Sequence, residues 1–283
     1  MLNKTIWLMW SVLAPVVVWA QTVTMVVGTA AGSSSDMAAR RMGAQAANVL
    51  GESWVVSNVV GGGGVHARRG FDMRPAQETL LVLSDVAADG GALQGLSPVA
   101  TILTQSFALV GRAGVRRPTV ISHAYGEGTR ARALAETIAR ALQATAVPYK
   151  GNVLAIFDAK QHGDSWVLVE GAGADTAQRE GLEVFAVGDK SLGLTNGYGQ
   201  ASGSGAQSFP SFADLLGQPI PAARATTSVY VQATGAQPLV TKLARLGLPE
   251  AGAAGSPPSV AAPTMQQGAS DDPKARGRSA RVM

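Results

Sequence analysis

One loop of small residues carries most of the chemistry that this sequence offers. Residues 28–35 read Gly-Thr-Ala-Ala-Gly-Ser-Ser-Ser and lie between an apolar run, Val23–Val27, and a helical pattern that begins at Asp36. The first N–H groups of a helix have no intrahelical acceptor, and here no bulky side chain covers them. Such a loop favours negative charge, so we predict a site for a small acid. Its expected contacts are Thr29, Ala30, Gly32, Ser33, Ser34 and Ser35.

Two glycine loops further along the chain could complete this site. Residues 61–64 are four consecutive glycines, and Gly126-x-Gly128-Thr129 precedes another helical pattern. Glycine lets a backbone approach a ligand closely, but it equally serves a tight turn with positive φ, so both roles stay open for Gly62 and Gly63. The second loop also fits the dinucleotide pattern GxGxxA. That pattern is common by chance, and no acidic residue follows at the required distance, which argues against a nucleotide.

The sequence offers no catalytic or metal-binding set. Its three histidines, His66, His123 and His162, are far apart, and the chain has no cysteine, so a metal site has no support. No nucleophile-elbow motif indicates hydrolysis. The net charge of +4 favours anionic partners, but the basic residues are scattered and not clustered. We therefore predict a binding protein with no cofactor, which is not an enzyme and does not bind nucleic acid.

Strand and helix patterns alternate along the chain and must position these loops. The alternation predicts an α/β fold with largely parallel sheets. The expected strands are residues 23–27, 54–60, 79–83, 99–110, 166–169, 182–187 and 229–231. The expected helices are residues 36–50, 65–71, 131–142, 153–161, 210–216 and 237–246. Residues 191–208 are rich in Gly and Ser and indicate a surface loop, and residues 252–283 lack large apolar side chains and are expected to be disordered.

The first twenty residues have the pattern of an export signal. A positive start at residues 1–4 precedes an apolar run over residues 6–19, and Val18-Trp19-Ala20 fits a cleavage site before Gln21. A membrane anchor is the alternative, but a spanning helix needs about 20 apolar residues. This run is shorter and contains Pro15. We expect a cleaved signal and a protein that is soluble after its removal.

Several motifs follow one another in a fixed order between residues 22 and 245. They are Val26-Val27-x-x-Ala30-Ala31-Gly32-x-Ser34-x-Asp36, Val55-Val56-x-Asn58-x-x-Gly61-x-Gly63-Gly64, Leu96-x-Pro98-Val99, Gly126-x-Gly128-Thr129, Val147-Pro148-Tyr149-Lys150-Gly151 and Pro210-Ser211-Phe212-Ala213-Asp214. In this order they resemble the substrate-binding proteins of tripartite tricarboxylate transporters, the Bug-type receptors. The run over residues 147–151 is the most specific of them.

The resemblance implies a periplasmic binding-protein fold of the type II kind, with a ligand cleft between two α/β lobes. The implied divisions are a signal peptide at residues 1–20, lobe 1 at 21–120 plus 224–250, lobe 2 at 121–223 and a low-complexity tail at 251–283. It also implies a periplasmic location, a small organic acid as ligand and a membrane permease of the tripartite tricarboxylate type as partner. Two alternatives stay open: a receptor that reports its ligand to a membrane signalling protein, and a degenerate relative that binds nothing.

The resemblance also extends the candidate site and exposes differences from the family. In the second lobe it adds Gly126, Gly128 and Thr129, and it suggests Tyr149, which could instead pack beneath that lobe. Arg132 stands where the family usually has His, and it would give a second carboxylate a bidentate partner if it faced the cleft. Thr29 replaces a usual aromatic residue, which implies a larger or wetter pocket. Beyond about residue 246 the family's further helices are missing, which suggests a truncated or frame-shifted member.

Overall fold

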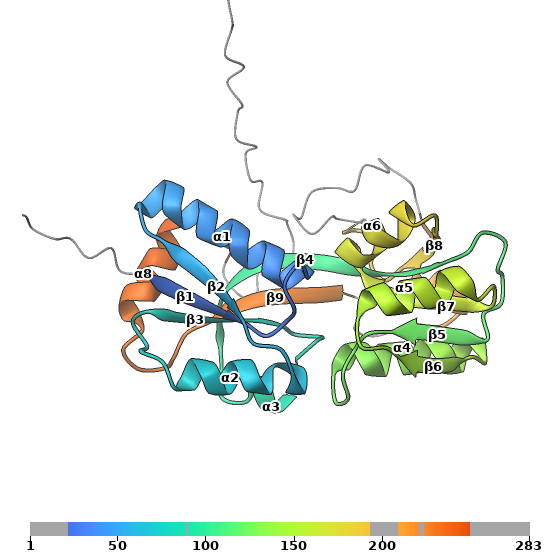
Figure 1. Cartoon of the computed structure of the whole chain (residues 1–283), viewed down its shortest axis with the longest axis horizontal. Coiled ribbons are helices and arrows are strands. Elements are labelled where there is room, and N and C mark those ends of the chain that lie inside the picture. The colour runs from blue at the N-terminus through green and yellow to red at the C-terminus, as the bar shows by residue number, and fades with distance from the viewer. Residues whose placement is uncertain (1–21, 89, 193–208, 221–223, 250–283) are drawn as a thin grey trace, which may run out of the picture.

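A computed structural model of the chain describes residues 22–88, 90–192, 209–220 and 224–249 (Figure 1). The expected signal at residues 1–20 and the expected tail at 251–283 lie outside these residues, as does most of the glycine- and serine-rich loop. Two α/β lobes stand side by side, and strands β4 (Pro98–Gly111) and β9 (Arg224–Tyr230) run from one toward the other.

Lobe 1 is built on five strands. β1 (Val23–Val27) pairs in parallel with β2 (Trp54–Asn58) on one side and β3 (Thr79–Ser84) on the other. β9 then pairs antiparallel with β3, and the first part of β4 pairs antiparallel with β9. All six residues of β3 are buried, as befits a strand covered by helices on both faces.

Lobe 2 continues the same sheet. The last five residues of β4, from Phe107 onward, pair antiparallel with β7 (Ser165–Glu170), and β8 (Glu183–Val187) also pairs with β4. β5 (Val120–His123) lies between β7 and β6 (Thr145–Pro148), parallel to both. The sheet is therefore mixed, and the expectation of largely parallel sheets is wrong, because β4 and β9 run antiparallel to every strand that they pair with.

Nine helical segments cover the sheet, and most begin and end close to the expected bounds. They are α1 (Ser34–Leu50), η1 (Gly62–Gly64), α2 (Val65–Asp72), α3 (Gly90–Leu93), α4 (Arg130–Leu142), α5 (Asn152–Gln161), α6 (Gly171–Arg179), α7 (Phe212–Leu216) and α8 (Gln237–Arg245), all counted within the described residues. The helix expected to start at Pro210 begins two residues later. Ser211 and Asp214 form a reciprocal capping box there, which fixes the start more strongly than proline does.

Five elements have no counterpart among the expected ones: η1, α3, β5, β6 and α6. α6 begins Gly171-Ala-Gly-Ala, a run with weak intrinsic helix propensity. Its small residues allow close packing, since a Cβ on Gly173 would meet the Cβ of Val169 at 2.7 Å. Ala174 and Ala177 of α6 are buried in one cluster with Ala108 and Val110 of β4, and this tertiary packing, which no local pattern contains, stabilises the helix.

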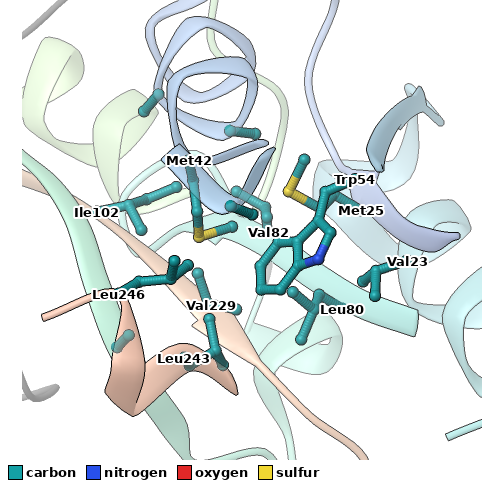
Figure 2. Packing of buried hydrophobic residues seen from close by; sticks show 14 of the residues in the cluster. Val23, Met25, Met42, Trp54, Leu80, Val82, Ile102, Val229, Leu243 and Leu246 are labelled. Carbon is teal, nitrogen blue, oxygen red and sulfur yellow. The ribbon is translucent and has the colours of Figure 1, made fainter. Parts of the chain in front are cut away.

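Each lobe has its own apolar core. Figure 2 shows the core of lobe 1, where Met42 of α1 and Trp54 of β2 pack with Leu243 and Leu246 at the end of the chain's last described helix. The core of lobe 2 includes Phe107, Ile138, Trp166 and Phe212. The ranges 21–120 plus 224–250 and 121–223 assigned to the lobes from the sequence stay a prediction.

The core of lobe 1 beneath the glycine loop can be tested with Phe71, which is fully buried in α2. We expect Phe71→Ala to lower the free energy of unfolding by about 3–5 kcal/mol, because the substitution leaves a cavity. Phe157→Ala is the matched control, since Phe157 is 58% exposed on α5 and should cost about 0.5 kcal/mol or less. Urea unfolding followed by circular dichroism measures both, and equal losses would contradict this packing.

Candidate functional site

A cleft of about 730 Å³ lies between the two lobes. Lobe 1 lines it with the loop after β1 and with the glycine loop after β2. Lobe 2 lines it with the loop after β5, with the start of α5 and the residues before it, and with the end of β7 and one side of α6. Among the residues expected from the sequence, those that line the cleft are Thr29, Ala30, Gly32, Ser33, Ser34, Ser35, Gly62, Gly63 and Gly126.

The N-terminus of α1 forms the centre of the lobe 1 wall. Ser33 is the N-cap residue, and its side chain accepts a hydrogen bond from the backbone N–H of Asp36 at 3.3 Å. The helix therefore starts at Ser34, earlier than the expected Asp36, and Ser33 takes the capping role expected of Ser34 or Ser35. The N–H groups of Ser34 and Ser35 occupy the first two helical positions, where no carbonyl one turn earlier can accept them. Both residues line the cleft.

A buried carboxylate holds this loop in place. Asp36 is 1% exposed and accepts hydrogen bonds from the N–H of Gly32 at 2.9 Å and from Nε of Arg40 at 3.0 Å. Its other oxygen accepts from Nδ2 of Asn58 at 3.0 Å, and the same Asn58 nitrogen donates to the carbonyl of Thr29 at 2.9 Å. Asp36 thus ties the loop to β2.

The pKa of Asp36 reflects these contacts. Burial raises it, but the hydrogen bonds from Arg40, Gly32 and Asn58, together with the charge of Arg40, outweigh burial and hold the pKa below its usual value. Asp36 is not among the residues that line the cleft. Its carboxylate is therefore engaged by hydrogen bonds beneath the loop and does not face an anionic ligand in the cleft.

The serines and the threonine of the loop have different partners. The hydroxyl of Ser35 lies 3.0 Å from that of Thr227 in β9, and both are buried. The hydroxyl of Thr29 lies 2.7 Å from that of Ser33. Ser35 therefore links the start of α1 to a strand that runs between the lobes.

The glycine loop has the backbone conformation of a tight turn, and it also lines the cleft. Gly61, Gly62, Gly63 and Gly64 all have positive φ, between 55° and 121°, so the turn needs glycine. A Cβ on Gly64 would also meet Leu83 at 2.9 Å. The same four residues line the cleft with backbone alone.

Four of the expected site residues do not line the cleft. Thr129 caps α4, because its hydroxyl donates to the carbonyl of Gly126 at 2.7 Å and accepts the N–H of Arg132 at 3.3 Å. Arg132 pairs with Glu136 one turn along the helix at 2.9 Å. Tyr149 packs against the lobe 2 core, where burial and the neighbouring Asp158 raise its pKa. Gly128 occupies the turn before the cap with φ of +76°.

Sequence reasoning missed most of the lobe 2 wall of the cleft, including Tyr125 and Glu170. Glu170 is the last residue of β7, directly before α6. In the sequence, Glu170 is a single carboxylate at the end of an apolar run. Such a position is the carboxyl end of a strand, where α/β sheets place ligand sites. Lys150, the neighbour of Tyr149 in the chain, also lines the cleft.

Within the described residues, no group of three or more His, Cys, Asp or Glu residues could hold a metal ion. Within the same ranges, none of the helices has the length and apolar character needed to cross a bilayer.

Solved structures share this fold. MatC from Rhodopseudomonas palustris, described with bound malate, is 22% identical over 80% of this chain and 83% of that chain, with a TM-score of 0.62. Rpa4515 from R. palustris, described with adipate, is 17% identical over 81% and 83%, with a TM-score of 0.63. The periplasmic binding protein BugD is 17% identical over 80% and 81%, with a TM-score of 0.59. No protein-family model matches the chain, and no curated protein sequence does either.

These likenesses confirm the α/β periplasmic binding-protein fold with two lobes that the sequence motifs predicted. The structural neighbours include BugD and a TctC solute-binding protein from Polaromonas, the kind of protein that the motifs resemble. At identities of 22% and below, the likeness concerns the fold alone.

The role of Asp36 gives a pH-dependent prediction. We expect Asp36→Asn to lower the free energy of unfolding at pH 7 by about 1–3 kcal/mol, because a buried hydrogen-bond network loses an acceptor. Since folding lowers the pKa of Asp36, its stabilisation is present above the unfolded pKa of about 4 and is lost as the pH falls through the lower folded value. The variant should therefore lose less stability than the parent between pH 5 and about 2.5.

Urea unfolding across that pH range measures the effect. Asp72→Asn is the control, because Asp72 is half-exposed and pairs with Arg68 on the surface of α2. It should cost about 0.5 kcal/mol or less. If the two variants had the same stability and the same pH profile, Asp36 would not hold the loop.

Proposed function

We propose that this chain is a periplasmic solute-binding receptor of the tripartite tricarboxylate (Bug-type) family that captures a small carboxylate. One observation carries the proposal: the unpaired N–H groups at the start of α1 line a cleft that the second lobe closes from the other side. A carboxylate there would form charge-assisted hydrogen bonds, which are stronger than neutral ones, and would also gain from the helix dipole. The expected site residues that line the cleft are the ones proposed to hold this carboxylate.

The ligand class is supported by two of the structural neighbours. MatC is described with malate and Rpa4515 with adipate, both small carboxylic acids. The cleft volume of about 730 Å³ suits a molecule of this size together with water. Di- and tricarboxylates and related organic acids are therefore the proposed class.

Capture would proceed by closure of the lobes about the strands that run between them. β4 and β9 are the natural hinge, because closure needs only a few residues of these strands to change their backbone angles. The bound acid would then meet lobe 1 through α1 and the glycine loop, and lobe 2 through residues such as Gly126. This mode of action requires no catalytic group.

The partner and the location belong to the same proposal. The export pattern at residues 1–20 and the kind of binding protein found among the neighbours support a periplasmic receptor that delivers its ligand to a membrane permease of the tripartite tricarboxylate type. Titration with a panel of mono-, di- and tricarboxylates tests the binding step. A ligand at about 100 times its Kd should add about 2.7 kcal/mol to the stability.

Ser34 allows the backbone amide to be tested by itself. Proline is tolerated at the first position of a helix, and the preceding Ser33 already has the extended backbone that proline requires, with φ of −71° and ψ of 163°. Ser34→Pro removes the N–H group, whereas Ser34→Ala removes only the hydroxyl. We expect Ser34→Pro to weaken carboxylate binding by about 10- to 100-fold and Ser34→Ala to weaken it much less.

Isothermal titration calorimetry with the best ligand of the panel provides the comparison, and the melting temperature of each unliganded variant reports its fold. If Ser34→Pro bound the acid as tightly as Ser34→Ala did, the amides of α1 would not be the carboxylate site. Failure of every acid in the panel to bind the parent protein would reject the proposed function.

A further inference from the structure

Two large apolar side chains are exposed on opposite walls of the cleft. Val60, directly before the glycine loop, belongs to the lobe 1 wall and is 60% exposed. Val153, in the first turn of α5, belongs to the lobe 2 wall and is 73% exposed. The other large hydrophobic side chains that are exposed in the described part of the chain do not line the cleft: Val49, Val55, Met73, Leu154 and Phe157.

The position of the two valines carries more weight than their exposure. A single exposed valine is ordinary on a protein surface, but here one faces the same cleft from each lobe. Tyr125 lines this cleft with only 8% of its surface exposed, so the much higher exposure of the valines puts them toward its open side. They therefore flank the opening through which a ligand passes.

Both valines are attached to well-anchored elements of their lobes. The residue before Val60 is pinned to β1, because the N–H of Val59 donates to the carbonyl of Val27 at 2.9 Å. Val153 is part of α5, which packs on the lobe 2 core through buried residues such as Ala155. Each valine therefore moves with its lobe when the cleft changes its width.

Ion pairs between the two walls are not available to hold the cleft shut. The charged residues that line it within the described chain are Lys150, Glu170, Asp175 and Arg179, and all four belong to lobe 2. The lobe 1 lining consists of Gly, Ala, Ser, Thr, Met and Val residues. Direct contacts between the walls must therefore be hydrogen bonds or apolar contacts.

We infer that Val60 and Val153 meet when the lobes close on a ligand, and that this apolar contact slows release of the ligand. The inference rests on the proposed function, because it concerns the closed form of the same cleft. Contact removes both side chains from water, which stabilises the closed form in proportion to the apolar area buried. Opening breaks the contact, so it adds to the barrier for release without touching the acid.

Release rates test the contact. Val60→Ser, Val153→Ser and the double variant are made in the full mature chain, and dissociation of a ¹⁴C-labelled acid of the panel is followed in a chase with unlabelled acid. We expect each single substitution to raise the dissociation rate about 3- to 10-fold, with a much smaller effect on association. Because both substitutions remove one contact, the double variant should release the acid no faster than the faster single variant.

Met73→Ser and Phe157→Ser are the matched controls. Met73 is 87% exposed on lobe 1, and Phe157 is 58% exposed on α5 one turn after Val153. Neither lines the cleft, so both controls should release the acid at the parent rate. The melting temperatures of all unliganded variants should stay close to that of the parent, because these side chains are largely in water when the cleft is open.

Two acids of different length distinguish a contact between lobes from a contact with the ligand. Succinate and adipate are the probes for the variants. If the valines touch each other, each substitution should speed the release of both acids by the same factor. Factors that differed more than about 3-fold between the acids would assign the valines to the ligand and overturn the contact between the lobes.

The chain has no cysteine, so an introduced pair reports the contact directly. Val60→Cys combined with Val153→Cys can form a disulfide under the oxidant diamide only when the two Cα atoms come within about 7 Å of each other. The ligand should accelerate this cross-linking at least 10-fold. Val60→Cys combined with Phe157→Cys is the control pair, and its cross-linking should be slower and respond to the ligand much less.

The outcomes separate the two proposals. If an acid bound the parent but left the cross-linking of the first pair unchanged, the contact would be overturned and the carboxylate receptor would stand. Release at the parent rate from both single variants, or additive effects in the double variant, would overturn the contact in the same way. If no acid of the panel bound the parent, the receptor proposal would be overturned, and the contact with it.

Discussion

The candidate site depends on where the carboxylate of Asp36 is held. An acidic residue in the first turn of a helix commonly turns toward the unpaired N–H groups of that turn, and there it would occupy the anion site with the protein's own charge. Here Gly32, Arg40 and Asn58 draw the carboxylate away, beneath the loop and against β2. The loop is fixed by this contact, and the amides of Ser34 and Ser35 stay free at the cleft.

The junction between the lobes has a different character from their cores. Each lobe is filled with apolar side chains, but the two connecting strands carry buried polar residues where they cross: Gln105, Ser106, Thr227 and Ser228. Ser106 accepts the N–H of Asp189 at 2.8 Å, and Asp189 in turn pairs with Arg224 at 2.6 Å. The polar groups at this junction can exchange their hydrogen-bond partners for water or ligand, which an apolar core cannot do. This property suits two lobes that close on a solute.

Much of this arrangement could be predicted from the sequence. The parts that could not be predicted depend on packing and pairing between distant segments of the chain. Apolar runs and caps predicted β1, α1, β3 and most of β4, because local periodicity determines these elements. The glycine loop was also predicted, because a turn with positive φ leaves few alternatives to glycine. α6 was missed because its glycines oppose a helix, and the packing against β4 that stabilises it involves residues distant in sequence. The mixed sheet was missed because strand direction depends on which distant strands pair.

The cleft lining was predicted well on the lobe 1 side, but on the lobe 2 side Gly126 alone of the expected residues lines it. The lobe 1 wall consists mainly of two continuous stretches of chain, the loop after β1 and the glycine loop, so its composition revealed it. The lobe 2 wall is assembled from separate elements, and Tyr125 and Glu170 meet only because β5 and β7 are neighbours in the sheet. Thr129, Arg132 and Tyr149 were plausible by type, but capping, an ion pair and core packing engage them elsewhere.

The most direct measurement is a titration of the ¹⁵N-labelled mature chain with its ligand, followed residue by residue in the backbone amide spectrum. Carboxylate capture by the start of α1 predicts that the amide protons of Ser34 and Ser35 shift strongly downfield and saturate together with the signals of the glycine loop. Saturable binding that leaves these two amides unmoved would contradict it.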